Sequence, residues 1–340
     1  MTKMGTAADC GFDSTNPSAD YDPSVGLETL EVVVHILMDD TCTQGVVSDA
    51  TVHTQMDILN EDFLAISGSP GAGGVDTQIQ FVLADEDPDG NPTTGITRDC
   101  NTTWYNDQGE YWETLAWDPD RYINIYVNTA GGAGGYVPFL PSASNADIGS
   151  TSDRVVINQL GFGPGGPVPA RDQGRLTTHE VGHYLGLFHP YFGGCGVSTA
   201  PDCYTTGDRI CDTEPDDTSH SGCPVGQTAC GGFTLPATNY MELTDDSCKD
   251  RFTLEQARRM RCTLEFYRPD LTTGALCDGV VCDPGEVCDE VSGTCVATDP
   301  VLWMSFRSNT TVPGVGTVAD EDIVSYDEST DTWALEFDGS

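Results

Sequence analysis

Basic residues are scarce in this chain. Its 340 residues include 14 lysines and arginines against 54 aspartates and glutamates, which gives a formal net charge of −40 at pH 7. Only two lysines are present, Lys3 and Lys249. Because phosphate backbones are bound by clustered positive charge, nucleic acid is excluded as a partner. The many aspartates suit calcium-binding loops and equally suit a protein adapted to salty surroundings, and the charge alone leaves both open.

Two further absences concern membranes and export. No apolar run approaches the ~18 residues of a membrane-spanning helix, so no such span is expected. Residues 1–8 contain one lysine and no apolar core, and therefore do not resemble a signal peptide. The chain nevertheless contains 14 cysteines and no other cysteine-rich metal motif, which predicts an oxidising compartment and a disulfide framework. We expect a secreted protein on this ground.

The stretch HEVGHYLGLFH, residues 179–189, has the spacing that a catalytic zinc ion requires. Residues four apart share one face of a helix, so His179 and His183 can both direct a ring nitrogen at one ion, at ~2.0–2.1 Å. His189 is the expected third ligand. Three protein ligands leave the fourth position open for water, which is the catalytic arrangement. Glu180 lies beside that position and is the predicted general base.

The residues around the motif support this interpretation. The third ligand cannot lie on the same helical face, so the helix must end and the chain must turn back. Gly186 permits the turn because glycine tolerates positive φ, and Pro190 cannot continue a helix. A short apolar helix that carries histidines by chance is the alternative, which Gly186 and His189 together disfavour. The remaining histidines lack such partners and are interpreted as ordinary strand, helix and loop residues: His35, His53 and His220.

Several separate motifs resemble one known group of proteins. Residues 239–260 read NYMELTDDSCKDRFTLEQARRM, residues 117–126 read WDPDRYINIY, and a Gly-Tyr-Val-Pro segment precedes the zinc motif. Over about residues 25–270 the chain resembles the pappalysin family of metzincin zinc metalloproteases. The resemblance implies an α+β, two-lobed domain with a twisted mixed sheet, helices and an irregular disulfide-rich lower lobe. It also implies that polypeptides are the substrates and that Zn²⁺ is the catalytic cofactor.

The resemblance assigns further roles near the metal. A methionine turn lies beneath the zinc in such enzymes, and Met241 fits it as an apolar floor. Many of them have a tyrosine two residues later that stabilises the tetrahedral intermediate, whereas Leu243 stands here. The following segment walls the pocket for the substrate residue on the carboxyl side of the cut bond. Lys249 in that pocket would favour an acidic or polar side chain; the alternative is that Lys249 and Arg251 both face solvent.

The stretch 191–238 holds five cysteines and little apolar periodicity, so disulfides and calcium are expected to stabilise it. Pappalysin-like enzymes bind calcium in this region, and a solvated acidic loop is the alternative because the spacing is not that of an EF-hand. The calcium candidates are Asp208, Asp212, Thr213 and Asp216. The expected disulfides are Cys195–Cys230, Cys223–Cys248, Cys203–Cys211, Cys42–Cys100, Cys277–Cys288 and Cys282–Cys295. Cys10 is a candidate cysteine switch that would occupy the zinc in a latent form, or else it pairs with another cysteine such as Cys262.

Periodicity places the main elements. Strands are expected at 30–38, 79–83, 122–128 and 155–158, and helices after Ser48 and at about 253–266. Gly131–Pro141 is expected to be an edge strand along the cleft, with a flexible surface loop as the alternative. The expected division is an N-terminal segment 1–27, a catalytic domain 28–270, a small disulfide-rich module 271–298 and a β-rich segment 299–340. A silent binding protein and a hydrolase of non-peptide substrates are the alternative functions.

Overall fold

The computed structural model describes residues 5–141 and 147–272 and six short strands beyond them. The chain divides into two compact units, Met1–Ala275 and Leu276–Ser340. In the second unit β9 (Glu286–Asp289) pairs with β10 (Thr294–Ala297), β11 (Thr310–Val312) with β12 (Gly316–Val318), and β13 (Ile323–Asp327) with β14 (Thr332–Glu336), all antiparallel. The expected disulfides Cys277–Cys288 and Cys282–Cys295 each include a cysteine, Cys277 or Cys282, that lies outside the described residues.

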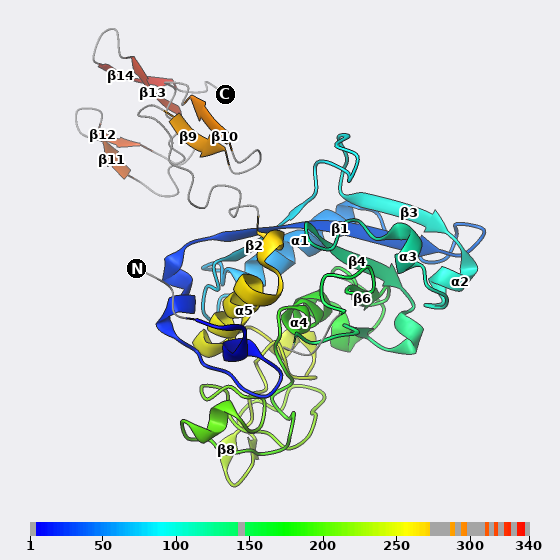
Figure 1. Ribbon diagram of the computed structural model, residues 1–340, viewed down its shortest axis with the longest axis vertical. Helices are drawn as coiled ribbons and strands as arrows, with labels where there is room; N and C mark the ends of the chain where they lie inside the picture. Colours follow the sequence, from blue (N-terminus) through cyan, green and yellow to red (C-terminus); the bar gives the residue numbers. More distant parts are fainter. Residues whose placement is uncertain are drawn as a thin grey trace. The chain divides into compact units, whose positions relative to one another are not determined.

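A six-stranded mixed sheet forms one layer of the first unit (Figure 1). Its strands are β1 (Glu28–Met38), β2 (Ile79–Leu83), β3 (Ile96–Cys100), β4 (Tyr122–Asn128), β5 (Gly135–Tyr136) and β6 (Val155–Asn158). The order is β2-β1-β4-β6-β5, and β3 pairs with the second half of β1. Every pair is parallel except β5 with β6, so β5 is an antiparallel edge strand. The structure confirms the expected α+β fold class, and within the edge strand expected over residues 131–141 it shows only the two-residue strand β5.

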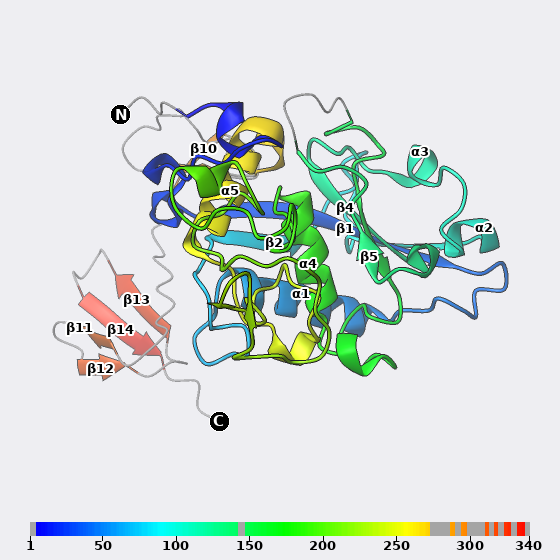
Figure 2. The same cartoon turned by 90° about the horizontal axis from the view of Figure 1, so that it is seen from below.

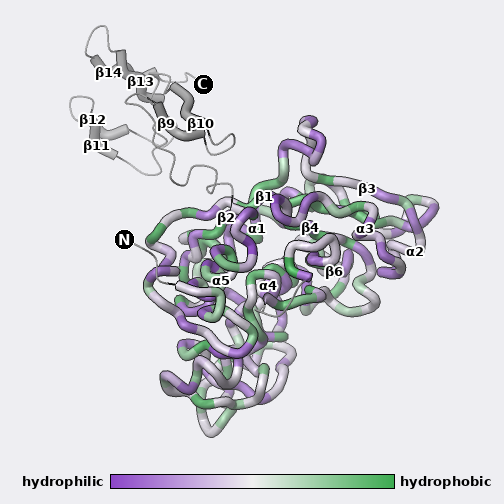
Figure 3. Tube along the Cα trace, viewed as in Figure 1, coloured by the Kyte–Doolittle hydropathy of each residue, from purple (hydrophilic) through white to green (hydrophobic). Residues whose placement is uncertain are grey.

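Three longer helices pack against one face of the sheet. They are α1 (Asp49–Phe63), α4 (Arg175–Tyr184) and α5 (Leu254–Tyr267). Ser48 caps α1 by accepting a hydrogen bond from the Thr51 amide, and Thr253 begins α5 with a capping box. α1 contacts both β2 and α4 (Figure 2). Apolar residues concentrate in the strands and the inner faces of these helices, which form the main hydrophobic core (Figure 3).

The opposite face of the sheet is covered by two short helices that the sequence did not predict, α2 (Thr102–Tyr105) and α3 (Trp112–Leu115). Their tryptophans pack against a second cluster of buried residues that includes Tyr111 and Val156. No helix among the described residues is long and apolar enough to cross a membrane.

Below α4, on the side away from the sheet, the chain from Leu185 to Thr253 is largely irregular (Figure 1). Its only strands are the two-residue β7 (Thr228–Ala229) and β8 (Phe233–Thr234). Three disulfides close loops here, Cys195–Cys230, Cys203–Cys211 and Cys223–Cys248. A fourth, Cys42–Cys100, lies in the upper part of the unit. These are the pairs expected from the sequence.

The N-terminal segment packs along α5 and corrects one prediction. Cys10 is fully buried and forms a disulfide with Cys262 of α5. A cysteine switch requires a free thiol that can reach the metal, so the switch assigned to Cys10 is wrong and the alternative pairing is right. Cys10 lies against α5 because the buried guanidinium of Arg259 donates hydrogen bonds to the carbonyl oxygens of Gly11 and Ser14. These bonds hold the N-terminal segment against the helix.

Candidate metal centre

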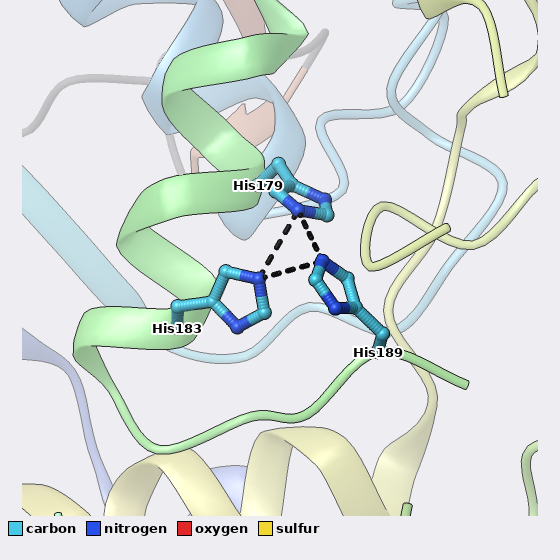
Figure 4. Close-up of side chains that lie close together, drawn as sticks. All are labelled: His179, His183 and His189. Carbon is cyan, nitrogen blue, oxygen red and sulfur yellow. Dashed lines mark hydrogen bonds between the residues drawn. The ribbon is translucent and has the colours of Figure 1, made fainter. Parts of the chain in front are cut away.

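Three histidines converge at the end of α4 (Figure 4). His179 and His183 lie one turn apart on the helix, which ends at Tyr184. Gly186 then adopts φ +93°, and a Cβ there would meet the Thr263 hydroxyl at 2.6 Å, so only glycine fits this turn. The chain reverses and brings the Nε2 atom of His189 to 3.1 Å from that of His179 and 3.0 Å from that of His183. The third Nε2 separation is 3.1 Å.

The opposite ring nitrogens fix the tautomers. Nδ1 of His179 donates to the carbonyl oxygen of Tyr240 at 2.7 Å, and Nδ1 of His183 donates to that of Leu187 at 2.8 Å. A neutral imidazole has one proton, so both Nε2 atoms carry lone pairs that face each other. Burial lowers the pKa of His183 to about 4 and that of His189 to about 3, which keeps the rings neutral. Converging lone pairs require a cation, and nitrogen donors at this spacing fit zinc.

Glu180 lies next to these rings and is only 5% exposed. Burial raises the pKa of its carboxyl group to about 8, and the positive charges of Lys249 and Arg171 oppose this shift. The edge strand passes directly over it, because a Cβ on Gly135 would lie 2.7 Å from the Glu180 Cγ atom. A larger residue at position 135 would therefore displace the carboxylate.

The metal centre opens into a cavity of about 670 Å³. One wall is the edge segment around β5, residues 133–137, and another is the segment that follows the methionine turn. Leu243, at the position of the missing tyrosine, lines the cavity and is 45% exposed. Lys249 also lines it and is 7% exposed, whereas the Arg251 side chain pairs with Asp250 outside the cavity. The structure thus places the Lys249 side chain in the cavity wall and separates it from Arg251.

The methionine turn packs beneath α4. Met241 is fully buried, and its Sδ atom occupies the space that a Cβ on Gly182 would need. Tyr240 is buried too, with its hydroxyl donating to an oxygen of Asp62 at 2.7 Å. Its phenol is therefore engaged with Asp62 and does not line the cavity.

The calcium candidates do not form one cluster. Asp208 accepts a 2.6 Å hydrogen bond from the Thr213 hydroxyl, while Asp212 accepts from the backbone amide of Glu255 at the start of α5. Asp216 is fully buried and lies 3.2 Å from a ring nitrogen of His220. The three aspartates do not bring their carboxylate oxygens within 4.8 Å of one another.

His35 and His53 lie outside the metal centre. His35 is buried in β1, between the side chains of Thr97 and Asn124. His53 lies exposed on α1. Both agree with the interpretation from the sequence.

Sequence reasoning missed two residues of the centre. Arg171 lines the cavity from a 3₁₀ turn (Pro169–Arg171). The surrounding loop is rich in glycine and proline and has no periodicity that would predict where its side chains lie. Gly135 belongs to the recognised Gly-Tyr-Val-Pro segment, but its contact with Glu180 depends on the pairing of β5 with β6.

Comparison with known proteins decides the family. A family profile described as pregnancy-associated plasma protein-A, of peptidase family M43, matches residues 106–265. An extracellular metalloprotease of Pyricularia oryzae is 32% identical over 247 residues, which cover 71% of this chain and 76% of that protein. The chain belongs to the pappalysin family. Extracellular metalloprotease 1 of Coccidioides posadasii is likewise 32% identical over 247 residues, covering 70% of this pappalysin and 78% of that protein.

Solved structures agree with this assignment. Mature mirolysin of Tannerella forsythia in complex with a cleaved peptide has a TM-score of 0.59 and 31% identity, covering 74% of this pappalysin and 97% of that chain. Mirolysin in complex with compound 9 gives a TM-score of 0.62 at the same identity and coverage. The predicted metzincin fold is confirmed, and so is the function: this pappalysin is a secreted zinc metalloendopeptidase. A metalloprotease requires a metal, and the histidine cluster fits one.

Proposed function

We propose that His179, His183 and His189 hold the catalytic zinc of this metalloendopeptidase and that Glu180 is its general base. The observation that carries the proposal is the convergence of three Nε2 atoms beside a buried carboxylate. Two of the rings are oriented by backbone carbonyls, as metal-bound imidazoles usually are.

When bound, zinc supplies Lewis acidity, which lowers the pKa of a water ligand and polarises the carbonyl group of the scissile bond. Glu180 accepts the proton from the attacking water and later delivers it to the leaving amine. Its buried position favours this role, because burial raises the affinity of a carboxylate for a proton. Leu243 has no donor for the oxyanion. The outer edge of β5 offers unpaired backbone groups to which a substrate strand adds, and glycines there allow close approach.

Digestion of casein or gelatin tests the proposal. Zinc-loaded wild type is expected to cleave, whereas Glu180→Gln keeps its zinc and its circular dichroism spectrum and loses about 10²- to 10⁴-fold in activity. Glu110→Gln, which changes an exposed glutamate remote from the cavity, is the matched control. Equal loss of zinc in Glu180→Gln would show that the carboxylate has a different role. A wild type that binds but never cleaves polypeptides would favour a silent binding protein.

We propose further that calcium stabilises the irregular lower region. Asp216 and Glu242 support this, because each has a buried carboxylate oxygen without a hydrogen-bond partner among the described residues. Burial and the neighbouring charge of Asp216 raise the pKa of Glu242 to about 7. A hard cation with oxygen ligands would satisfy both groups.

For the rest of the chain we propose the division into a catalytic domain, residues 28–270, a disulfide-rich module, 271–298, and a β-rich segment, 299–340. The N-terminal segment, residues 1–27, is attached to the catalytic domain by the Cys10–Cys262 disulfide and the Arg259 hydrogen bonds, and functions as part of it.

A further inference from the structure

Lys249 and Arg171 differ from the other basic residues in the part of the chain that the structure describes. Neither side chain donates a hydrogen bond or joins an ion pair there. Every other described arginine donates at least one hydrogen bond: Arg98, Arg121, Arg154, Arg175, Arg209, Arg251, Arg258, Arg259, Arg261 and Arg268. In a chain with a net charge of −40, cations without partners stand out.

Both residues line the cavity that contains Glu180. Arg171 ends the 3₁₀ turn Pro169–Arg171, and Lys249 follows the turn Asp246–Cys248, which contacts the first turn. The Arg171 guanidinium lies against the edge segment, because a Cβ on Gly134 would meet its Nη1 atom at 2.6 Å. The two positive charges therefore flank the place where a substrate strand would pair with β5.

The carboxylates of Asp246, Glu180 and Glu242 lie near Lys249, but none of them forms an ion pair or a hydrogen bond with its ammonium group. Asp246 accepts hydrogen bonds from the backbone amides of Gln173 and Arg175, although its second oxygen is buried without a partner. Glu242 accepts from two other backbone amides. No described carboxylate oxygen lies within 4.0 Å of the Lys249 ammonium nitrogen. The ammonium group thus reaches the cavity with its hydrogen-bonding capacity unused.

We propose that this cleft selects peptides with an acidic side chain beside the scissile bond, and that Lys249 and Arg171 bind its carboxylate. This inference rests on the proposed function and names its substrate class. Lys249 is already largely desolvated by folding, at 7% exposure, so little further desolvation of the cation opposes binding. A cation held in this way discriminates charge, because a neutral amide in place of the carboxylate leaves the ammonium unpaired.

Matched peptides test the proposal with the zinc-loaded full chain. A peptide library first gives the residues on both sides of the cut bond, and pairs of peptides are then made that differ only by Glu or Gln at each position. For wild type we expect kcat/KM to be about 10- to 100-fold higher for the Glu peptide at one position. Lys249→Met should reduce this ratio to near one, Arg171→Gln should reduce it in part, and Lys249→Arg should retain it. Arg251→Gln removes a positive charge two residues away, outside the cavity, and should leave the ratio unchanged.

Two results would overturn the proposal. One is an unchanged Glu-to-Gln ratio in Lys249→Met. The other is an equal loss of kcat for both peptides, which would make Lys249 a participant in the reaction step in place of the missing tyrosine. Failure of the proposed function is distinct, since wild type would then cleave no peptide. Cleavage that Glu180→Gln abolishes, but that shows no preference for Glu, removes only the present inference.

Discussion

Gly182 of α4 and Met241 of the methionine turn are in such close contact that a Cβ on Gly182 would overlap the sulfur atom of Met241. The methionine turn can therefore pack this closely against α4 only because residue 182 has no side chain. Gly182→Ala is expected to lower the free energy of unfolding by about 1–3 kcal/mol, because either α4 or Met241 must move. Zinc affinity should fall as well, since His179 and His183 flank the displaced residue. Urea unfolding and zinc titration measure the two effects.

The partner residue supplies the control for Gly182→Ala. Met241→Ala alone opens a cavity and should also destabilise the protein. In the double variant the new methyl group occupies part of that cavity, so the combined loss should be smaller than the sum of the two single losses. Strictly additive losses would mean that the contact does not constrain the helix.

Arg259 provides a second prediction. It is buried, and it donates hydrogen bonds to the carbonyl oxygens of Gly11, Ser14 and Gly186 at 2.7–3.1 Å. Arg259→Met should cost about 3–5 kcal/mol of unfolding free energy, because several buried acceptors lose their donor at once. Arg258→Met is the matched control. Arg258 pairs with Asp22 in a partly exposed ion pair, so its loss should cost about 1 kcal/mol or less. Similar losses in both variants would contradict the assigned role.

The third prediction, the effect of removing residues 1–27, rests on the same contacts. The disulfide and the Arg259 hydrogen bonds make this segment part of the fold, so the truncated protein should have lower thermal stability and lower proteolytic activity. A truncated protein that is more active than the full chain would restore the latency model that the Cys10–Cys262 disulfide contradicts.

The sequence predicted most of the framework because the relevant patterns are local. The apolar run of β1 and the helical periodicity after Ser48 identify their elements within one or two residues. β3 was missed, because its residues ITRDC are half-exposed and pair only with the second half of β1. Helices α2 and α3 were missed because four residues are too few to show a period.

At the metal centre, too, the sequence predicted what depends on local spacing and missed what depends on contacts between distant segments. The three histidines and Glu180 follow from spacing along one helix and one turn. The contact of Gly135 with Glu180 and the contact of the Arg171 guanidinium with the edge segment join segments that are distant in the sequence. Such contacts depend on strand pairing and loop packing, which leave no local pattern in the sequence. The calcium candidates named from the sequence lie between residues 208 and 216, whereas the buried carboxylate of Glu242, which we add to the proposed site, lies next to the methionine turn.

The fourth prediction concerns calcium. Withdrawal of free calcium, with free zinc held constant, should lower the melting temperature of wild type by roughly 5–10 °C, because a ligand that binds only the folded state stabilises it. Asp216→Asn should remove most of this response, since it takes away a buried carboxylate of the proposed site. An unchanged melting temperature in wild type would leave these groups without a metal role.

The fifth prediction concerns His35 and acid stability. Nε2 of His35 donates to the side-chain oxygen of Asn124 at 3.0 Å, and Nδ1 accepts from the Thr97 hydroxyl at 2.8 Å, so the ring is held neutral. Burial lowers its pKa to about 4 in the folded state, whereas an unfolded histidine has a pKa of about 6.5. The unfolded state then binds more protons between these two values. The stabilising contribution is complete above pH 6.5 and is lost as the pH falls towards 4.

Between pH 7 and pH 5 this loss should be about 2 kcal/mol of unfolding free energy. His35→Gln keeps a donor and an acceptor in similar positions but cannot titrate, so its decline over the same interval should be smaller than that of wild type by this amount. His53→Gln, at an exposed position on α1, is the control and should decline like wild type. Both variants keep the three metal-centre histidines, so any acid release of zinc is common to all proteins and cancels in the comparison. Urea unfolding at the two pH values measures the difference, and parallel declines in wild type and His35→Gln would assign the acid sensitivity to other groups.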